Sequence, residues 1–90
     1  MHYAKTDNFE KAIIFFERAS SIQPKEVKWR LMIGTCYRKM NLFNEAHKIY
    51  EDVYNLYPDN LDNLRMLVQI RKDLGLKFQD LMQKVMALDR

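Results

Sequence analysis

A 34-residue periodicity constrains the fold of this chain more than any other feature of its sequence. Pro24 and Pro58 are separated by this interval. The same shift superposes further pairs of matching or similar residues: Tyr3 on Tyr37, Phe9 on Phe43, Ala12 on Ala46, Phe16 on Tyr50 and Ala19 on Val53. A fixed interval of this length indicates a repeat protein, in which each unit buries its apolar surface only against its neighbours.

The spacing of apolar residues within the interval predicts two helices for each repeat. Apolar side chains recur at steps of three and four residues, which is typical of a helix with one buried stripe. The stripes are Ala12, Phe16 and Ala19; Trp29, Ile33, Cys36 and Met40; Ala46, Tyr50 and Val53; Leu61, Leu64 and Val68; and Phe78, Leu81, Val85 and Leu88. The sequence therefore predicts an all-α chain of about five helices in antiparallel pairs, preceded by the remnant of a truncated first helix.

Capping residues predict where helices begin. Asp7, with Glu10 three residues later, forms a capping-box pattern for a helix that starts near Phe9. After Pro58, either Asp59 or Asn60 is suited to cap the next helix. The helix from Phe9 is expected to be covered on more than one side, because it carries apolar groups around much of its circumference.

Proline and glycine predict where helices end. A residue before proline avoids the helical conformation, so we expect helices to stop near Ile22 and Leu56. Gly75 fits the left-handed position after a helix, and the basic pair at 71–72 suits the negative end of that helix dipole.

Composition excludes several protein classes. The chain has 90 residues with 48% hydrophobic and 30% charged residues, and its formal net charge is +3. A single cysteine cannot form an internal disulfide, and the longest apolar run, at 12–16, is far too short to cross a membrane. With no signal-peptide pattern at the N-terminus, we expect a soluble intracellular protein.

No residue pattern predicts catalysis, a metal site or a cofactor. His2 and His47 lie far apart without other ligands at metal-binding spacing, and the two glycines do not form a phosphate-binding loop. Cys36 lies on an apolar stripe, which favours a buried, unreactive thiol. The methionines at core-like spacing, Met32 and Met66 among them, are interpreted as gap-filling residues. The chain is therefore expected not to be an enzyme.

These features resemble the tetratricopeptide repeat family, which uses 34-residue helix pairs with small residues at the helix crossing and a closing proline. The resemblance implies a superhelix of stacked pairs with three units: 1–24 with a truncated first helix, 25–58 complete, and 59–90 degenerate. It also implies that the parent chain is longer. The positions that match the family's motif are Ala12, Phe16, Ala19, Pro24, Gly34, Tyr37, Ala46, Tyr50 and Pro58.

A more specific resemblance is to the tetratricopeptide subunits of intraflagellar transport complex B. It depends on the segments at 9–29, 31–32, 36–39 and 73–77, which include residues outside the general repeat pattern. It implies a scaffold for building cilia and flagella, located in the cytoplasm, the cilium and the basal body, with other complex B core subunits as partners. An adaptor or cochaperone in another assembly is the alternative, although the family's clamp for a terminal carboxylate is absent.

In this family the first helix of each pair lines a concave surface. The residues expected there are Lys28, Leu31, Thr35, Arg38, Lys39, Asp62, Arg65, Gln69 and Lys72, a set with a net positive charge. Their net positive charge would suit a groove for an acidic protein segment, and a simple solvated face is the alternative that the pattern leaves open. A weak nucleic-acid site is a third alternative, without aromatic stacking groups to support it. We expect protein partners without nucleic acid or membrane, and self-association through exposed repeat ends.

Overall fold

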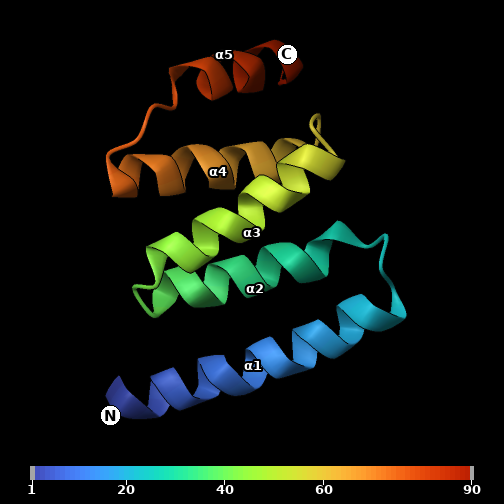
Figure 1. Cartoon of the computed structure of the whole chain (residues 1–90), viewed down its shortest axis with the longest axis vertical. Coiled ribbons are helices and arrows are strands. Elements are labelled where there is room, and N and C mark those ends of the chain that lie inside the picture. Colours follow the sequence, from blue (N-terminus) through green and yellow to red (C-terminus); the bar gives the residue numbers. More distant parts are fainter. Residues whose placement is uncertain (1, 90) are drawn as a thin grey trace.

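The structure is a computed structural model that describes the backbone of residues 2–89 and the side chains of residues 8–89. Its elements are five helices: α1 (His2–Ile22), α2 (Val27–Lys39), α3 (Phe43–Leu56), α4 (Leu61–Leu74) and α5 (Gln79–Leu88). They follow one another along the long axis of the molecule in chain order (Figure 1). The described part of the chain contains no strand.

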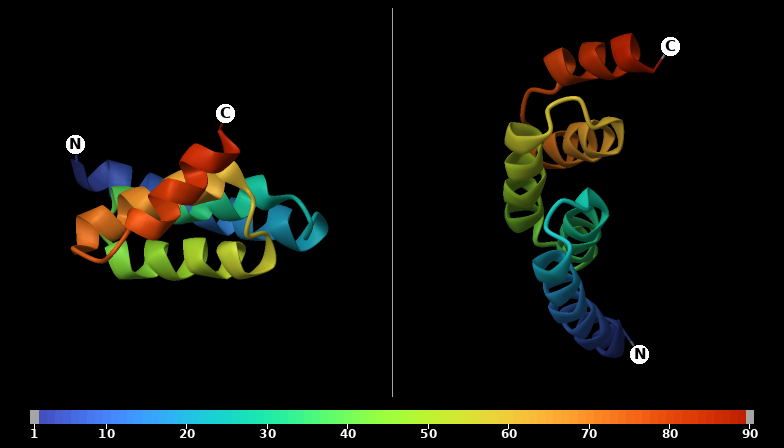
Figure 2. Two further views of the ribbon diagram at one scale, coloured as in Figure 1. Left: turned by 90° about the horizontal axis from the view of Figure 1, so that it is seen from above. Right: turned by 90° about the vertical axis from the view of Figure 1, so that its right-hand side faces the viewer.

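The helices form a curved stack in which each one packs against its neighbours in the sequence. Seen from the side, the stack is an arc with α2 and α4 on its inner side and α1 and α3 on its outer side (Figure 2). We call these sides the concave face and the convex face. This arrangement confirms the predicted all-α solenoid of stacked helix pairs.

Several predicted helix ends are confirmed. The helices before the two prolines end at Ile22 and Leu56, as the restriction on residues before proline requires. The side chain of Asn60 accepts a hydrogen bond of 2.9 Å from the backbone N–H of Asn63, so Asn60 is the cap of α4. Gly75 ends α4 in the left-handed conformation, with φ of 74°.

The predicted start of the first helix is wrong. α1 begins at His2 and continues without interruption, so Asp7 lies inside the helix and cannot cap it. Residues 2–6 are therefore part of α1 and not a remnant of a separate helix. A capping residue starts a helix only where the chain enters from an extended conformation, and no glycine or proline between 2 and 22 breaks the helix.

The main hydrophobic core lies between α2, α3 and α4. Ala46, Tyr50 and Val53 on α3 are completely buried, together with Leu64 and Leu67 on α4. The ring of Tyr50 lies against α2 at Gly34, where any larger residue would collide with it. This close approach explains why a glycine and an aromatic residue occur 16 positions apart in the complete repeat.

The equivalent stripe of α1 is less covered. Phe16 and Ala12 are only half-buried, although the residues 34 positions later are completely buried. In the second core cluster Ile13 is buried against Ile33 and Cys36 of α2, while Phe9, Ala12 and Phe16 of α1 are only partly buried against it. The expectation that α1 is covered on more than one side is wrong for the described chain, because Phe15 is 62% exposed. Tyr3, which matches Tyr37, lies outside the described side chains.

Candidate functional site: the groove between α2 and α4

A groove of about 560 Å³ runs along the concave face between α2 and α4. Its volume is within the range of ~300–1,000 Å³ found for ligand sites in proteins. One wall comes from α2 and the residue before it, and the other comes from α4 and its cap. The lining residues are Glu26, Val27, Lys28, Leu31, Met32, Arg38, Asn60, Asp62, Arg65, Met66 and Gln69.

The structure brings six of the nine sequence-predicted residues together in this groove. They are Lys28, Leu31, Arg38, Asp62, Arg65 and Gln69. The regular structure explains the grouping, because residues three and four apart share one face of a helix.

Three of the predicted residues do not line the groove. Thr35 lies behind its wall, where its hydroxyl shares a hydrogen bond of 3.3 Å with the Tyr50 hydroxyl and donates one of 3.9 Å to the Met66 sulfur. Lys39 is the exposed last residue of α2. Lys72 places its ammonium 5.1 Å from the ring centroid of Phe78, outside the groove. Thr35 therefore positions the groove wall, whereas Lys39 and Lys72 lie apart from it.

The charges of the groove are balanced and do not form a uniformly basic wall. Arg38 makes an ion pair of 3.0 Å with Asp73, so it links α2 to α4 across the groove. Gln69 donates to the same carboxylate at 3.4 Å. Arg65 makes an ion pair of 2.6 Å with Asp89, just after α5. The helical spacing of the basic residues does not reveal these two acidic partners, Asp73 at the end of α4 and Asp89 after α5.

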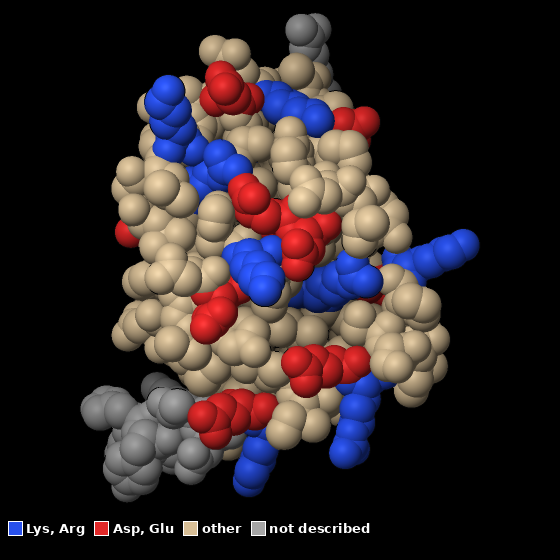
Figure 3. All heavy atoms as spheres, in the orientation of Figure 1, with Lys and Arg blue, Asp and Glu red and all other residues tan. Residues whose placement is uncertain are grey.

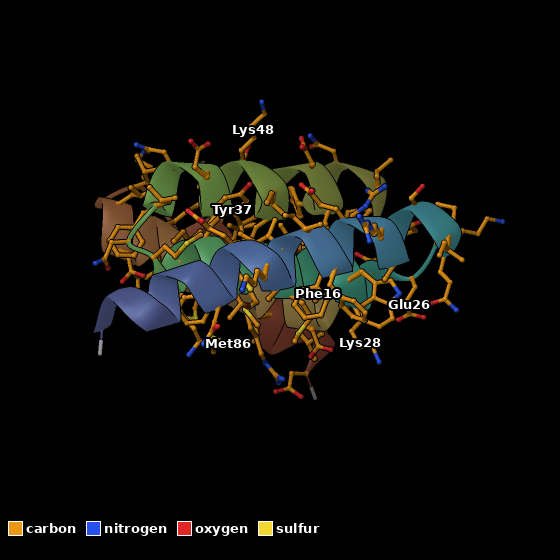
Figure 4. All side chains as sticks on the ribbon, turned by 90° about the horizontal axis from the view of Figure 1, so that it is seen from below. Phe16, Glu26, Lys28, Tyr37, Lys48 and Met86 are labelled. Atoms are coloured by element: carbon orange, nitrogen blue, oxygen red, sulfur yellow. The ribbon has the colours of Figure 1, made fainter. Side chains whose placement is uncertain are left out.

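Lys28 is more available to a binding partner than Arg38 and Arg65. It is exposed, and its ammonium lies 5.1 Å from the ring centroid of Trp29. Trp29 is held in turn by a hydrogen bond of 2.8 Å from its ring N–H to the Gln23 side chain. In a view from below the stack, Lys28, Glu26 and Phe16 lie on the side of α1 opposite to Lys48 of α3 (Figure 4).

The sequence predicted Leu31 in the groove but not its two methionines. Met32 lines the groove and is 42% exposed, so its interpretation as a gap-filling core residue is wrong. Met66 is half-buried and contributes to the opposite wall. Leu31 is buried in the main core, where its side chain forms part of the floor. The adjacent apolar residues at 31–32 could have indicated that Met32 faces the groove, because consecutive positions on a helix point in different directions.

The chemistry of the described side chains is that of a packing surface. Cys36 is buried, and burial raises the pKa of its thiol above the ordinary value of 9.0, so the reactive thiolate is disfavoured. Burial likewise raises the pKa of Tyr50 above 10.0. His47 contacts Glu51 at 3.4 Å on the same helix, and Glu51 also pairs with Arg71 of α4.

In the described part of the chain, no group of three or more histidine, cysteine, aspartate or glutamate residues converges on a point that would hold a metal ion. None of the described helices combines the length and apolar character that a membrane crossing requires.

Comparison with known proteins agrees with the repeat pattern. The family model described as tetratricopeptide repeat matches residues 2–26 and 30–60. The human protein named intraflagellar transport protein 88 homolog, or polaris, is 47% identical over 62 residues. This match covers 69% of the chain and 8% of the human protein, so the chain corresponds to a small part of that relative.

Proposed function

Because this chain belongs to the tetratricopeptide repeat family, we propose that it is a non-catalytic scaffold that binds other subunits of intraflagellar transport complex B. The observation that supports this proposal is the groove on the concave face, with apolar residues between α2 and α4 and charged groups around them. The similarity to the human intraflagellar transport protein supports the choice of complex. The proposed locations are accordingly the cytoplasm, the cilium or flagellum, and the basal body.

The mechanism of the scaffold is packing. Three units, 1–24, 25–58 and 59–90, are proposed to stack so that the helices on the convex face brace those on the concave face. The main core packs α2, α3 and α4 together and so positions the two walls of the groove, and the exposed ion pair of Arg38 with Asp73 adds a link between them. A partner segment then binds a preformed surface, which reduces the entropy lost on association. Arg65 and Lys28 are proposed to select partner orientation and association rate more than affinity.

The chemistry of the groove favours a partner segment with apolar residues and both charge signs. Met32 and Met66 offer flexible apolar surface on opposite walls. Lys28 suits a carboxylate, and Glu26 and Asp62 suit basic side chains of the same segment. This proposal replaces the purely acidic partner that the sequence predicted.

Co-purification from ciliated cells tests the proposed function. The tagged chain is expected to recover complex B core subunits, and not a peptide with the C-terminal carboxylate of a chaperone. In a variant with Lys28→Glu and Met32→Glu, recovery should fall by about tenfold, because two groove residues are changed. The matched control carries Lys48→Glu and Ile14→Glu, which alter an exposed lysine on α3 and an exposed apolar residue on α1, both outside the groove. Equal recovery by both variants, or recovery of the chaperone peptide alone, would refute the proposal.

A further inference from the structure

A second groove, of about 610 Å³, lies on the other side of α2, between α1 and α3. Viewed from below the stack, Tyr37 of α2 lies between the ribbons of α1 and α3, and Lys48 projects from α3 on the same side of the molecule (Figure 4). The residues that line it are Glu17, Ser20, Arg30, Ile33, Tyr37, Ile49, Asp52, Asn55 and Leu56. None of these residues lines the groove on the concave face. We call this second site the convex groove.

The floor and one wall of the convex groove are apolar. Ile33 and Tyr37 come from α2, and Ile49 and Leu56 come from α3. Ile33 is buried, whereas Leu56 is 58% exposed at the end of α3. An exposed leucine beside a preformed hollow is the kind of apolar surface that a binding partner covers.

Charged groups surround this apolar surface on three helices. Glu17 comes from α1, Asp52 from the facing wall of α3 and Arg30 from α2. Within residues 8–89, none of the three takes part in an ion pair, in contrast to the arginines of the concave groove. The convex face as a whole carries acidic and basic side chains interspersed with uncharged surface (Figure 3). The two carboxylates on opposite walls thus make the convex groove locally acidic.

We propose that the convex groove binds an amphipathic helix of a partner protein, with a central lysine or arginine flanked by aliphatic residues. The basic side chain would reach Glu17 and Asp52 from between the two walls, and the aliphatic residues would cover Ile49 and Leu56. The guanidinium of Arg30 can donate hydrogen bonds to an acidic side chain of the partner helix, or to the backbone carbonyl groups at the C-terminal end of that helix.

The surrounding secondary structure favours a helix over an extended segment. An extended segment gains affinity by pairing its backbone with the free edge of a sheet. All three elements around the convex groove are helices, whose backbone groups are already paired within each helix. A helix brings its own backbone hydrogen bonds and presents only side chains, as the groove requires.

This inference goes beyond the proposed function, since α2 contributes to two grooves on opposite faces. Leu31 lies in one and Ile33 in the other. The scaffold therefore holds two protein segments at once, one on each face of the stack.

Selection from a displayed library of helical peptides tests the convex groove. The library contains random peptides of about four helical turns and is panned against the unchanged chain. Enriched peptides should contain a lysine or arginine with aliphatic residues three and four positions away. Their affinity should fall by about tenfold or more on a Glu17→Lys, Asp52→Lys variant, because two attractive charges become repulsive.

The matched control variant carries Glu10→Lys and Glu45→Lys. These substitutions change exposed glutamates on the same two helices, outside the groove, and alter the net charge by the same amount. Circular dichroism melting curves establish that both variants remain folded, and Leu56→Ala provides an uncharged second test that should also weaken binding. The inference is overturned if no peptide is enriched or if the enriched peptides lack basic residues. It is also overturned if both charge variants weaken binding equally, or if Lys28→Glu with Met32→Glu abolishes it.

Discussion

The contact between Gly34 and Tyr50 makes a sharp prediction about the packing of α2 on α3. A methyl group added at Gly34 would lie 2.5 Å from Cε1 of the Tyr50 ring and 2.7 Å from Cζ. Ordinary contacts begin at 3.4 Å, so α2 and the ring must separate by about 0.9 Å, which is 3.4 minus 2.5. Tyr50 has no exposed surface, and its hydroxyl shares a hydrogen bond with that of Thr35, so a shift of the ring would disturb both its buried packing and this hydrogen bond.

The Gly34→Ala substitution should therefore destabilise the protein although it improves helix propensity. Alanine is favoured over glycine inside a helix by about 1 kcal/mol. Overpacking of a rigid core site costs about 3 kcal/mol, at the upper end of the usual range. The expected net loss of unfolding free energy is about 2 kcal/mol, which corresponds to a fall in Tm of about 8–16 °C for a domain of this size.

Urea denaturation, followed by circular dichroism and by Trp29 fluorescence, measures this loss. The control places Gly34→Ala in a Tyr50→Leu background, where the ring atoms of the collision are gone. There the substitution should be neutral or stabilising by about 1 kcal/mol, giving a coupling free energy of about 2–3 kcal/mol. A stabilised single variant, or the same penalty in both backgrounds, would show that the close approach does not shape the helix pair.

Capping, burial and titration each give one further prediction. Asn60→Ala should lower the unfolding free energy by about 1 kcal/mol in urea titrations, because a cap is lost, whereas Asp59→Ala should change it by less than about 0.5 kcal/mol. Tyr50→Ala should lower the free energy of unfolding by about 3–5 kcal/mol. Phe16→Ala should lower it by only about 1–2 kcal/mol, because Phe16 is half-buried. Equal losses for the two variants would contradict the unequal burial of these matching positions in the two repeats. Stability should fall as the pH rises above about 9, since the raised pKa values of Cys36 and Tyr50 mean that the unfolded chain releases these protons first. Cys36→Ala should reduce the slope of this fall near pH 9, and a pH titration of Tm that showed no difference would exclude the thiol as its source.

Local signals in the sequence were enough to predict the helices and the order in which they stack. The interval between Pro24 and Pro58 established the repeat, and Gly75 and Asn60 each occupy the helix end that their chemistry favours. Asp7 misled because a capping residue inside a helix has the same sequence pattern as one at its start. A capping residue marks the start of a helix only where the chain changes direction before it. That change of direction depends on tertiary packing and not on the local sequence.

The candidate site was predictable only in part. Helical spacing placed Arg38 and Arg65 on the concave face, but it did not reveal that Asp73 and Asp89 neutralise them. These acidic partners lie 35 and 24 residues away in the sequence, so only the superhelical arrangement brings them close. The convex groove was not predicted at all, since its three helices contribute residues that show no common sequence pattern.

The most direct test of the account is NMR spectroscopy of the methionine methyl groups during titration with a purified complex B core subunit. Met32 and Met66 line the concave groove, whereas Met40 packs in the second core cluster and Met86 is exposed on α5. Binding in the groove predicts changes in the resonances of Met32 and Met66 that saturate together, with little change at Met40 and Met86. Changes at Met86 with unaltered Met32 and Met66 signals would contradict the role of the concave groove.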